Sequence, residues 1–223
     1  MPPVQNEKNS GKTFLNIVAG RIVEVVAEGT PGAVARVNKV GKTVFEKTHD
    51  AWGGIVRDWK IEEFEYEGKK MKTLKVSFDD ASLSLSGGMM REFIQKFAGA
   101  DKQKSIVVSP YPDFIGKNGQ PRKSGLTLIQ DSNRLYSHFS DYNKETNTFS
   151  QKNGFPIAPD RWDAMTEEQK AIYKIQVNSF LEKYVTENPL NTIGAGSENA
   201  PEELPTINIE DEKEDVKLDE IPF

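Results

Sequence analysis

The chain has 223 residues, of which 36% are hydrophobic, and a formal net charge of −5 at pH 7. It contains no cysteine, which excludes disulfides, thiolate metal sites and a cysteine nucleophile and fits a reducing compartment. Residues 1–12 lack the apolar core of a signal peptide, and no segment approaches the roughly 18 apolar residues of a membrane span. We therefore expect a cytoplasmic protein (in the host cytoplasm if the chain is viral) that has no membrane contact.

The negative charge is concentrated at the C-terminal end. Residues 198–223 contain ten acidic and two basic side chains, whereas residues 1–197 contain 24 acidic and 27 basic ones. An acidic arm on a mildly basic body indicates that the body handles a polyanion, which the arm resembles electrostatically.

The sequence of the first two thirds of the chain predicts mainly β-structure. Residues 14–26 are rich in β-branched side chains and contain Gly20, and a glycine inside a strand often marks a bulge or sharp bend that a small barrel needs. Alternating or β-rich segments predict further strands at residues 34–40, 43–48, 55–66, 71–79, 82–86, 105–109 and 126–130.

Two segments have helical periodicity. The first follows Gly87-Gly88, ends near Gly99, and places five apolar side chains on one face: Met89, Met90, Phe93, Ile94 and Phe97. The second begins with a capping box at Thr166 to Gln169 and runs to about Glu187. Its expected apolar face consists of Tyr173, Val177, Phe180, Leu181 and Tyr184.

The order of three strands, a helix and two strands is that of an OB-fold, a five-stranded Greek-key barrel that often binds oligonucleotides. We therefore expect a mainly β fold with one internal helix and an added C-terminal helix, packed on the barrel or on a second copy in a homodimer. The predicted parts are a flexible arm at 1–12, the OB-fold domain at 13–140, a loop plus helix at 141–190, and a disordered acidic tail at 191–223.

Catalytic motifs are missing from the sequence. The only histidines, His49 and His138, have no metal-ligand spacing, and no phosphate loop or serine nucleophile motif is found. We therefore expect no enzyme activity and no cofactor. One alternative is a magnesium-dependent nuclease that uses Asp79, Asp80 and Glu62, although paired Asp residues at a strand end also favour a turn. A second alternative is an interaction adaptor that binds no DNA.

Basic and aromatic residues alternate in several segments, as sequence-independent binding of single-stranded DNA requires. For phosphate contacts we predict Arg57, Lys117, Arg122, Lys123 and Arg134. For base stacking we predict Trp52, Trp59, Tyr111, Phe114 and Tyr136, although these rings could instead fill the core.

The last five residues have an order that a solubilising tail does not require. Acidic Asp219 and Glu220 precede Ile221-Pro222-Phe223, and a terminal aromatic ring with its carboxylate can be captured by a basic, hydrophobic pocket. The segment Asp219-Glu220-Ile221-Pro222-Phe223 closely resembles the C-terminal tip of bacterial single-stranded DNA-binding proteins, with one Glu in place of Asp. The body's larger size makes the chain more similar to the bacteriophage members.

This resemblance implies an OB-fold that coats single-stranded DNA during replication, recombination and repair. It also implies that the tip recruits replication proteins such as a polymerase, primase or helicase.

Overall fold

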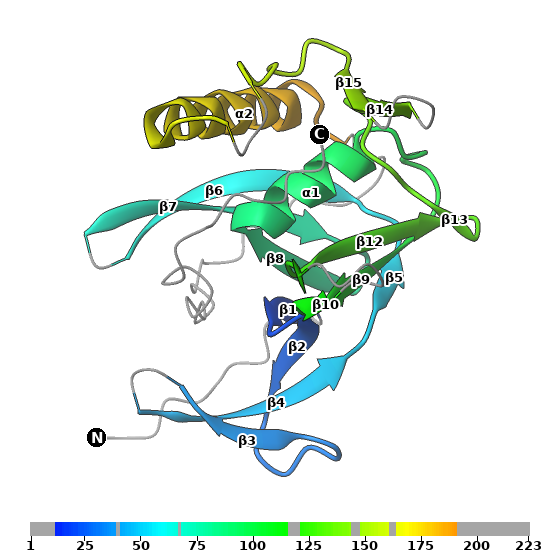
Figure 1. Cartoon of the computed structure of the whole chain (residues 1–223). Helices are drawn as coiled ribbons and strands as arrows, with labels where there is room; N and C mark the ends of the chain where they lie inside the picture. Colours follow the sequence, from blue (N-terminus) through cyan, green and yellow to red (C-terminus); the bar gives the residue numbers. More distant parts are fainter. Residues whose placement is uncertain are drawn as a thin grey trace.

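The computed structural model describes residues 12–38, 41–66, 68–115, 121–143, 148–160 and 164–190. These residues form a mainly β structure with two helices, as predicted (Figure 1). The strands are β1 (Thr13–Val18), β2 (Arg21–Val26), β3 (Val34–Val37), β4 (Thr43–His49), β5 (Trp52–Gly54), β6 (Asp58–Tyr66), β7 (Lys69–Ser77), β8 (Ala81–Ser86), β9 (Ile106–Tyr111), β10 (Phe114–Ile115), β11 (Pro121–Arg122), β12 (Gly125–Gln130), β13 (Asn133–Arg134), β14 (Ser140–Asn143) and β15 (Thr148–Gln151).

Seven strands form one large mixed sheet in the order β3-β4-β2-β1-β8-β7-β6. All its pairs are antiparallel except β1 with β8, which run parallel with Leu15 opposite Leu83. The β3–β4 hairpin, at one end of this sheet, projects away from both helices (Figure 1). We call residues 20–38 and 41–49, which contain β2, β3 and β4, the wing.

A second sheet has four strands in the order β13-β12-β9-β5. Among the described residues no strand pair joins it to the seven-stranded sheet, so the strands do not close into the predicted five-stranded barrel. Beside the short strand β13, helix α1 (Gly87–Phe97) bonds to the backbone of β12 at Leu126. The Leu126 N–H donates to Glu92 Oε2 at 2.7 Å, and the Leu126 carbonyl accepts a hydrogen bond from Lys96 Nζ.

One apolar core lies between the two sheets, and α1 fills one end of it. The predicted apolar face of α1 is confirmed, because Met90, Phe93, Ile94 and Phe97 are buried. These helix residues pack against strand residues from both sheets. The strand side chains are almost completely buried: Leu74, Val76, Leu83, Leu85, Ile106, Val108, Leu126 and Leu128.

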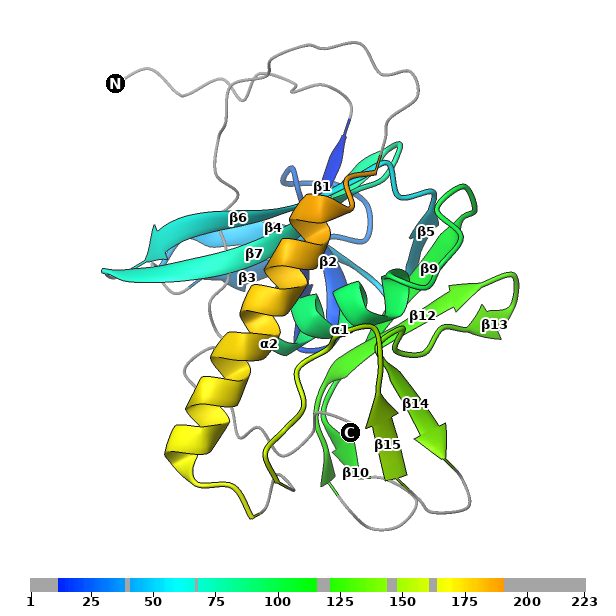
Figure 2. The same ribbon diagram turned by 90° about the horizontal axis from the view of Figure 1, so that it is seen from above.

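Helix α2 (Glu167–Glu187) confirms the predicted capping box. The Thr166 Oγ1 accepts from the Gln169 N–H at 3.2 Å, and Gln169 Oε1 accepts from the Thr166 N–H at 2.8 Å. The helix packs on α1 and β6 of the same chain (Figure 2). Its buried side chains include Tyr173, Val177 and Leu181.

No helix in the described part of the chain is both long and apolar enough to cross a membrane. The predicted arm, apart from Lys12, and the whole predicted tail at 191–223 lie outside the described residues.

Candidate nucleic-acid interface

Trp59 is not a stacking residue, and that prediction is wrong. Its side chain is only 3% exposed, it packs edge-on against Phe97 and Tyr184, and its Nε1 donates to the Asn188 carbonyl at 2.9 Å. The Lys102 ammonium lies 5.7 Å from its ring centroid, and burial there lowers the pKa of Lys102 to about 8. The ring therefore secures the end of α2 and has no face open to a base.

Arg57 directly precedes β6 of the seven-stranded sheet, whereas the other predicted cations with described side chains, Lys123 and Arg134, lie by the four-stranded sheet. Its guanidinium binds both oxygens of Asp79, at 2.6 and 3.1 Å, and this hydrogen bonding lowers the pKa of the Asp79 carboxyl. Arg57 and Trp59 therefore do not form a common binding surface, because the Arg57 guanidinium is held by a carboxylate and the Trp59 ring is buried.

The carboxylates of the nuclease alternative do not converge. Glu62 forms ion pairs with Lys60 and Lys75, at 2.6 and 2.7 Å, four residues along β6 from the strand's start. At about 3.3 Å per residue, that places Glu62 roughly 13 Å from the end of the hairpin where Asp79 lies. Within the described ranges, no group of three or more His, Asp or Glu side chains could hold a metal ion.

The four-stranded sheet has one face turned to the core and one turned to solvent. Ile106, Val108, Leu126 and Leu128 are fully buried, so the alternating side chains lie on the opposite face. Residues directly opposite each other on paired strands point to the same face of the sheet. We call the face opposite the core the outer face. Its residues are Val107, Ser109, Tyr111, Thr127, Ile129 and Arg134.

Predicted rings and cations lie along the outer face and beyond its ends. At one end, the Arg134 guanidinium carbon is 5.8 Å from the ring centroid of Tyr136, which is 74% exposed. At the other end, the ring of Tyr111 lies edge-on to that of Phe114, with centroids 5.8 Å apart, and Phe114 is 47% exposed. The structure thus brings four predicted residues onto one strip, which consists of Tyr111, Phe114, Arg134 and Tyr136.

Trp52 does not belong to this strip. It pairs with Val108 and therefore lies on the core side of the sheet, where it packs edge-on against His49 with centroids 5.1 Å apart. Its indole Nε1 is buried and has no hydrogen-bond partner among the described residues.

Beyond Tyr111 the strand pair β9–β12 continues into the hairpin formed by β10 and β11. We call residues 111–125 the basic hairpin. Lys123 lies there with its Nζ 3.3 Å from Asp113 Oδ2. Of the other predicted contacts, Lys117 lies outside the described residues, and for Arg122 only the backbone is described.

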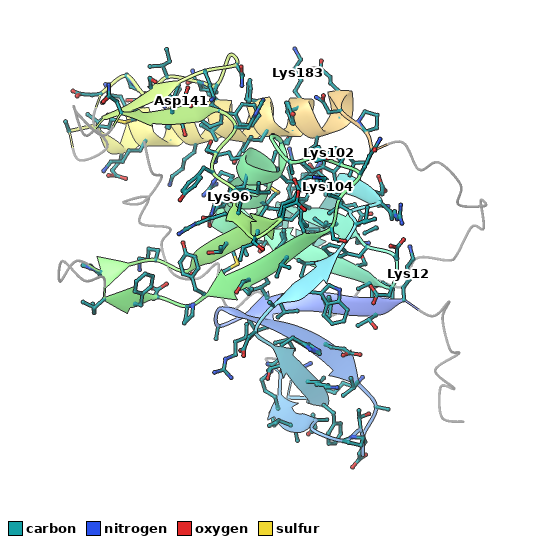
Figure 3. The ribbon with its side chains drawn as sticks, turned by 90° about the vertical axis from the view of Figure 1, so that its right-hand side faces the viewer. Lys12, Lys96, Lys102, Lys104, Asp141 and Lys183 are labelled. Carbon is teal, nitrogen blue, oxygen red and sulfur yellow. The ribbon has the colours of Figure 1, made fainter. Side chains whose placement is uncertain are left out.

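Helix α1 holds the base of this hairpin. The Lys96 side chain is buried, and its position above β12 is shown in Figure 3. Its ammonium donates hydrogen bonds to Glu92 and to the Leu126 carbonyl. Burial lowers the pKa of Lys96, and the neighbouring Glu92 opposes that shift. A Cβ at the adjacent Gly125 would lie 2.5 Å from the Tyr111 hydroxyl and 2.6 Å from Glu92 Oε2, so only glycine allows this close packing.

The wing and the basic hairpin meet at Gly20. Gly20 forms the β1–β2 turn with a φ of +72°, after Ala19 with a φ of +49°. A Cβ at Gly20 would lie 2.5 Å from Pro112 Cα and 2.6 Å from the Tyr111 carbonyl carbon. The glycine therefore marks a tight turn pressed against the hairpin backbone, rather than the bend inside a strand that its sequence context predicts. From this contact the hairpin and the wing project in different directions (Figure 3).

The wing carries cations that the sequence analysis missed. Arg21, Lys42 and Lys47 are exposed and form no ion pair with any described residue. Lys47 lies directly opposite Glu24, but Glu24 Oε2 instead contacts His49 Nε2 at 3.2 Å. The sequence offered one signal for these cations, the number of basic residues in the wing. It could not show that Lys47 lacks the Glu24 carboxylate as a partner, because that depends on the strand register.

No family model, curated protein or solved structure matches this chain. The functional assignment therefore depends on the residues and their geometry.

Proposed function

We propose that this protein binds single-stranded DNA without catalysing a reaction, and that it coats exposed strands in replication, recombination and repair. The observation that carries the proposal is the distribution of rings and unpaired cations. Exposed Tyr136 and Phe114 lie with Arg134 along the outer face and beyond its ends, and the exposed wing cations Arg21 and Lys47 form no ion pair with any described residue.

The β6–β7 hairpin provides an internal comparison. Each lysine of β6 and β7 whose side chain is described forms an ion pair with a carboxylate: Lys60, Lys70, Lys72 and Lys75. Cations that are already neutralised contribute little to phosphate binding, whereas unpaired ones beside exposed rings suit a strand that offers both phosphates and bases. The proposed DNA path therefore follows the outer face, the basic hairpin and the wing.

The order of β6 to β8, α1, β9 and β12 supports an open variant of the OB-fold, in which an exposed sheet face and its flanking loops bind the strand. The proposal needs no closed barrel, because the outer face lies on the second sheet alone.

A salt titration tests the proposal. We expect a fluorescent thymine oligomer to bind the full chain more tightly than a duplex of equal length. The logarithm of its binding constant should fall linearly with the logarithm of the salt concentration. Fluorescence anisotropy at several salt concentrations measures both. Equal affinity for the duplex, or no binding at low salt, would refute the proposal, and the latter result would favour the adaptor alternative.

The acidic tip has a separate proposed role. Its resemblance to the tip of bacterial single-stranded DNA-binding proteins supports docking of a replication protein on Asp219 to Phe223. We expect removal of these five residues to abolish co-purification of a polymerase, primase or helicase, and to leave DNA affinity equal or higher because negative charge is lost. A variant with Phe223 alone replaced by Ala controls for charge. Unchanged partner binding in both variants would contradict this role.

A further inference from the structure

The neck of the basic hairpin contains a carboxylate that phosphate binding does not explain. Asp113 lies directly before Phe114, and its side chain is 55% exposed. A carboxylate repels phosphate groups, so it weakens DNA binding if backbone contacts are the only role of this surface. Its position beside an exposed ring instead suits contact with a base.

The structure holds this carboxylate in place. Asp113 Oδ1 accepts a hydrogen bond from the Ser124 N–H at 2.6 Å, and Oδ2 lies 3.3 Å from Lys123 Nζ. The Ser124 N–H is the largest cause of the lowered pKa of Asp113, with Lys123 acting in the same direction, so the group is ionised at neutral pH. An ionised carboxylate only accepts hydrogen bonds, and its solvent-facing lone pairs remain open to a ligand's N–H groups.

Next to the carboxylate is a hollow of about 210 Å³. Its described lining combines apolar surface with one polar edge: Asp113, Phe114, Ile115, Pro121 and Lys123. The exposed Phe114 ring can stack on a flat heterocycle, while the edge supplies an acceptor and a cation. A ligand that fits this arrangement is planar, presents N–H donors at its edge and carries a phosphate.

We propose that this hollow is a base-selective subsite, and that Asp113 favours a nucleobase with an amino group, guanine above all. The inference rests on the proposed function. Guanine presents adjacent N1–H and N2–H donors, which can bind both oxygens of one carboxylate, while its ring stacks on Phe114 and its phosphate lies near Lys123. Cytosine and adenine offer one amino group each. Thymine offers one N–H between two carbonyl oxygens, which the carboxylate repels.

Asp113 also has a purely structural role, since its bond to Ser124 closes the hairpin neck. Asp113→Asn separates the two roles. Asparagine keeps an oxygen acceptor for the Ser124 N–H, but it replaces the second acceptor by a donor. The hairpin is therefore retained, while paired recognition of guanine is lost.

The test measures anisotropy with three fluorescent oligomers of equal length in potassium-free lithium buffer, which avoids guanine quadruplexes. One contains only thymine, one has guanine at alternate positions, and one has hypoxanthine, which lacks the 2-amino group, at those positions. We expect the wild-type chain to bind the guanine oligomer about tenfold more tightly than the thymine oligomer, with hypoxanthine between them, since a good bidentate pair discriminates by about that factor. Asp113→Asn should reduce the ratio to about twofold or less, because one of the paired hydrogen bonds is lost.

Asp141→Asn is the matched control, because Asp141 forms a similar exposed ion pair with Lys152 at 2.6 Å on another hairpin. It should keep the full guanine preference. Equal wild-type affinity for all three oligomers, or a preference that survives in Asp113→Asn, would overturn the subsite and leave single-stranded binding intact. Absence of binding to all three would overturn the proposed function itself. The hypoxanthine comparison uses the wild-type chain, so the subsite stays testable if Asp113→Asn does not fold.

Discussion

Replacing Phe114 and Tyr136 together by alanine should lower the affinity for single-stranded DNA about hundredfold. Each stacked base contributes about 1–3 kcal/mol, and losing two such contacts removes about 3 kcal/mol, or roughly a factor of 100. Both rings are exposed on the strip of the outer face, so their loss should change the free energy of unfolding by no more than about 0.5 kcal/mol. Anisotropy titration and urea denaturation measure the two quantities.

The salt dependence of this double variant distinguishes stacking from electrostatics. The slope of log affinity against log salt should stay at the wild-type value, because neither substitution removes a phosphate contact. Replacing Arg21 and Lys47 by glutamine should instead reduce the slope. Phe14→Ala is the matched control, because Phe14 is 49% exposed but lies on β1, outside the wing and the outer face, and it should leave affinity unchanged. An equal loss in Phe14→Ala would contradict the assignment of the outer face.

Gly20→Ala should both destabilise the protein and weaken DNA binding. The new Cβ would overlap the backbone of Tyr111 and Pro112, which cannot rotate away as a flexible side chain would. The positive φ adds about 1 kcal/mol of strain, and the overlap adds about 1–3 kcal/mol. We expect the free energy of unfolding to fall by about 3 kcal/mol in urea denaturation. DNA affinity should fall as well, because the hairpin that carries Phe114 must shift.

Gly29→Ala separates the effect of the backbone strain at positive φ from the effect of the Gly20–Pro112 contact. Gly29 has a φ of +81°, but nothing lies within 4 Å of the position its Cβ would take. This control should lose only about 1 kcal/mol and keep full DNA affinity. If the two variants behaved alike, the Gly20–Pro112 contact would have no role in placing the hairpin.

The local elements could be predicted because short-range chemistry determines them. The capping box at Thr166 depends on a hydrogen-bond exchange over three residues, and the buried face of α1 follows from the helical spacing of Met90, Phe93 and Phe97. The rings on the basic hairpin were found for a similar reason: Tyr111 and Phe114 have polar neighbours and no apolar periodicity to bury them.

Pairings between distant segments could not be predicted. Trp59 alternates with polar residues like a surface ring, yet α2, more than a hundred residues later in the chain, covers it and accepts its N–H at Asn188. Lys47 lies opposite an acid, yet it forms no ion pair with any described residue, because Glu24 contacts His49. In both cases the outcome depends on which element packs above the residue and on the strand register.

By itself the sequence determined the mainly β character, both helices and their faces, and the division into a basic body and an acidic end. Periodicity, capping and charge composition are local properties, and no tertiary contact is needed to read them. Only the tertiary structure decided that the two sheets stay unjoined, because strand pairing depends on contacts between distant segments, and α1 satisfies the Leu126 backbone of β12 through Glu92 and Lys96. It also decided that Gly20 joins the wing to the hairpin, because this contact requires two backbone segments ninety residues apart to meet without a side chain between them.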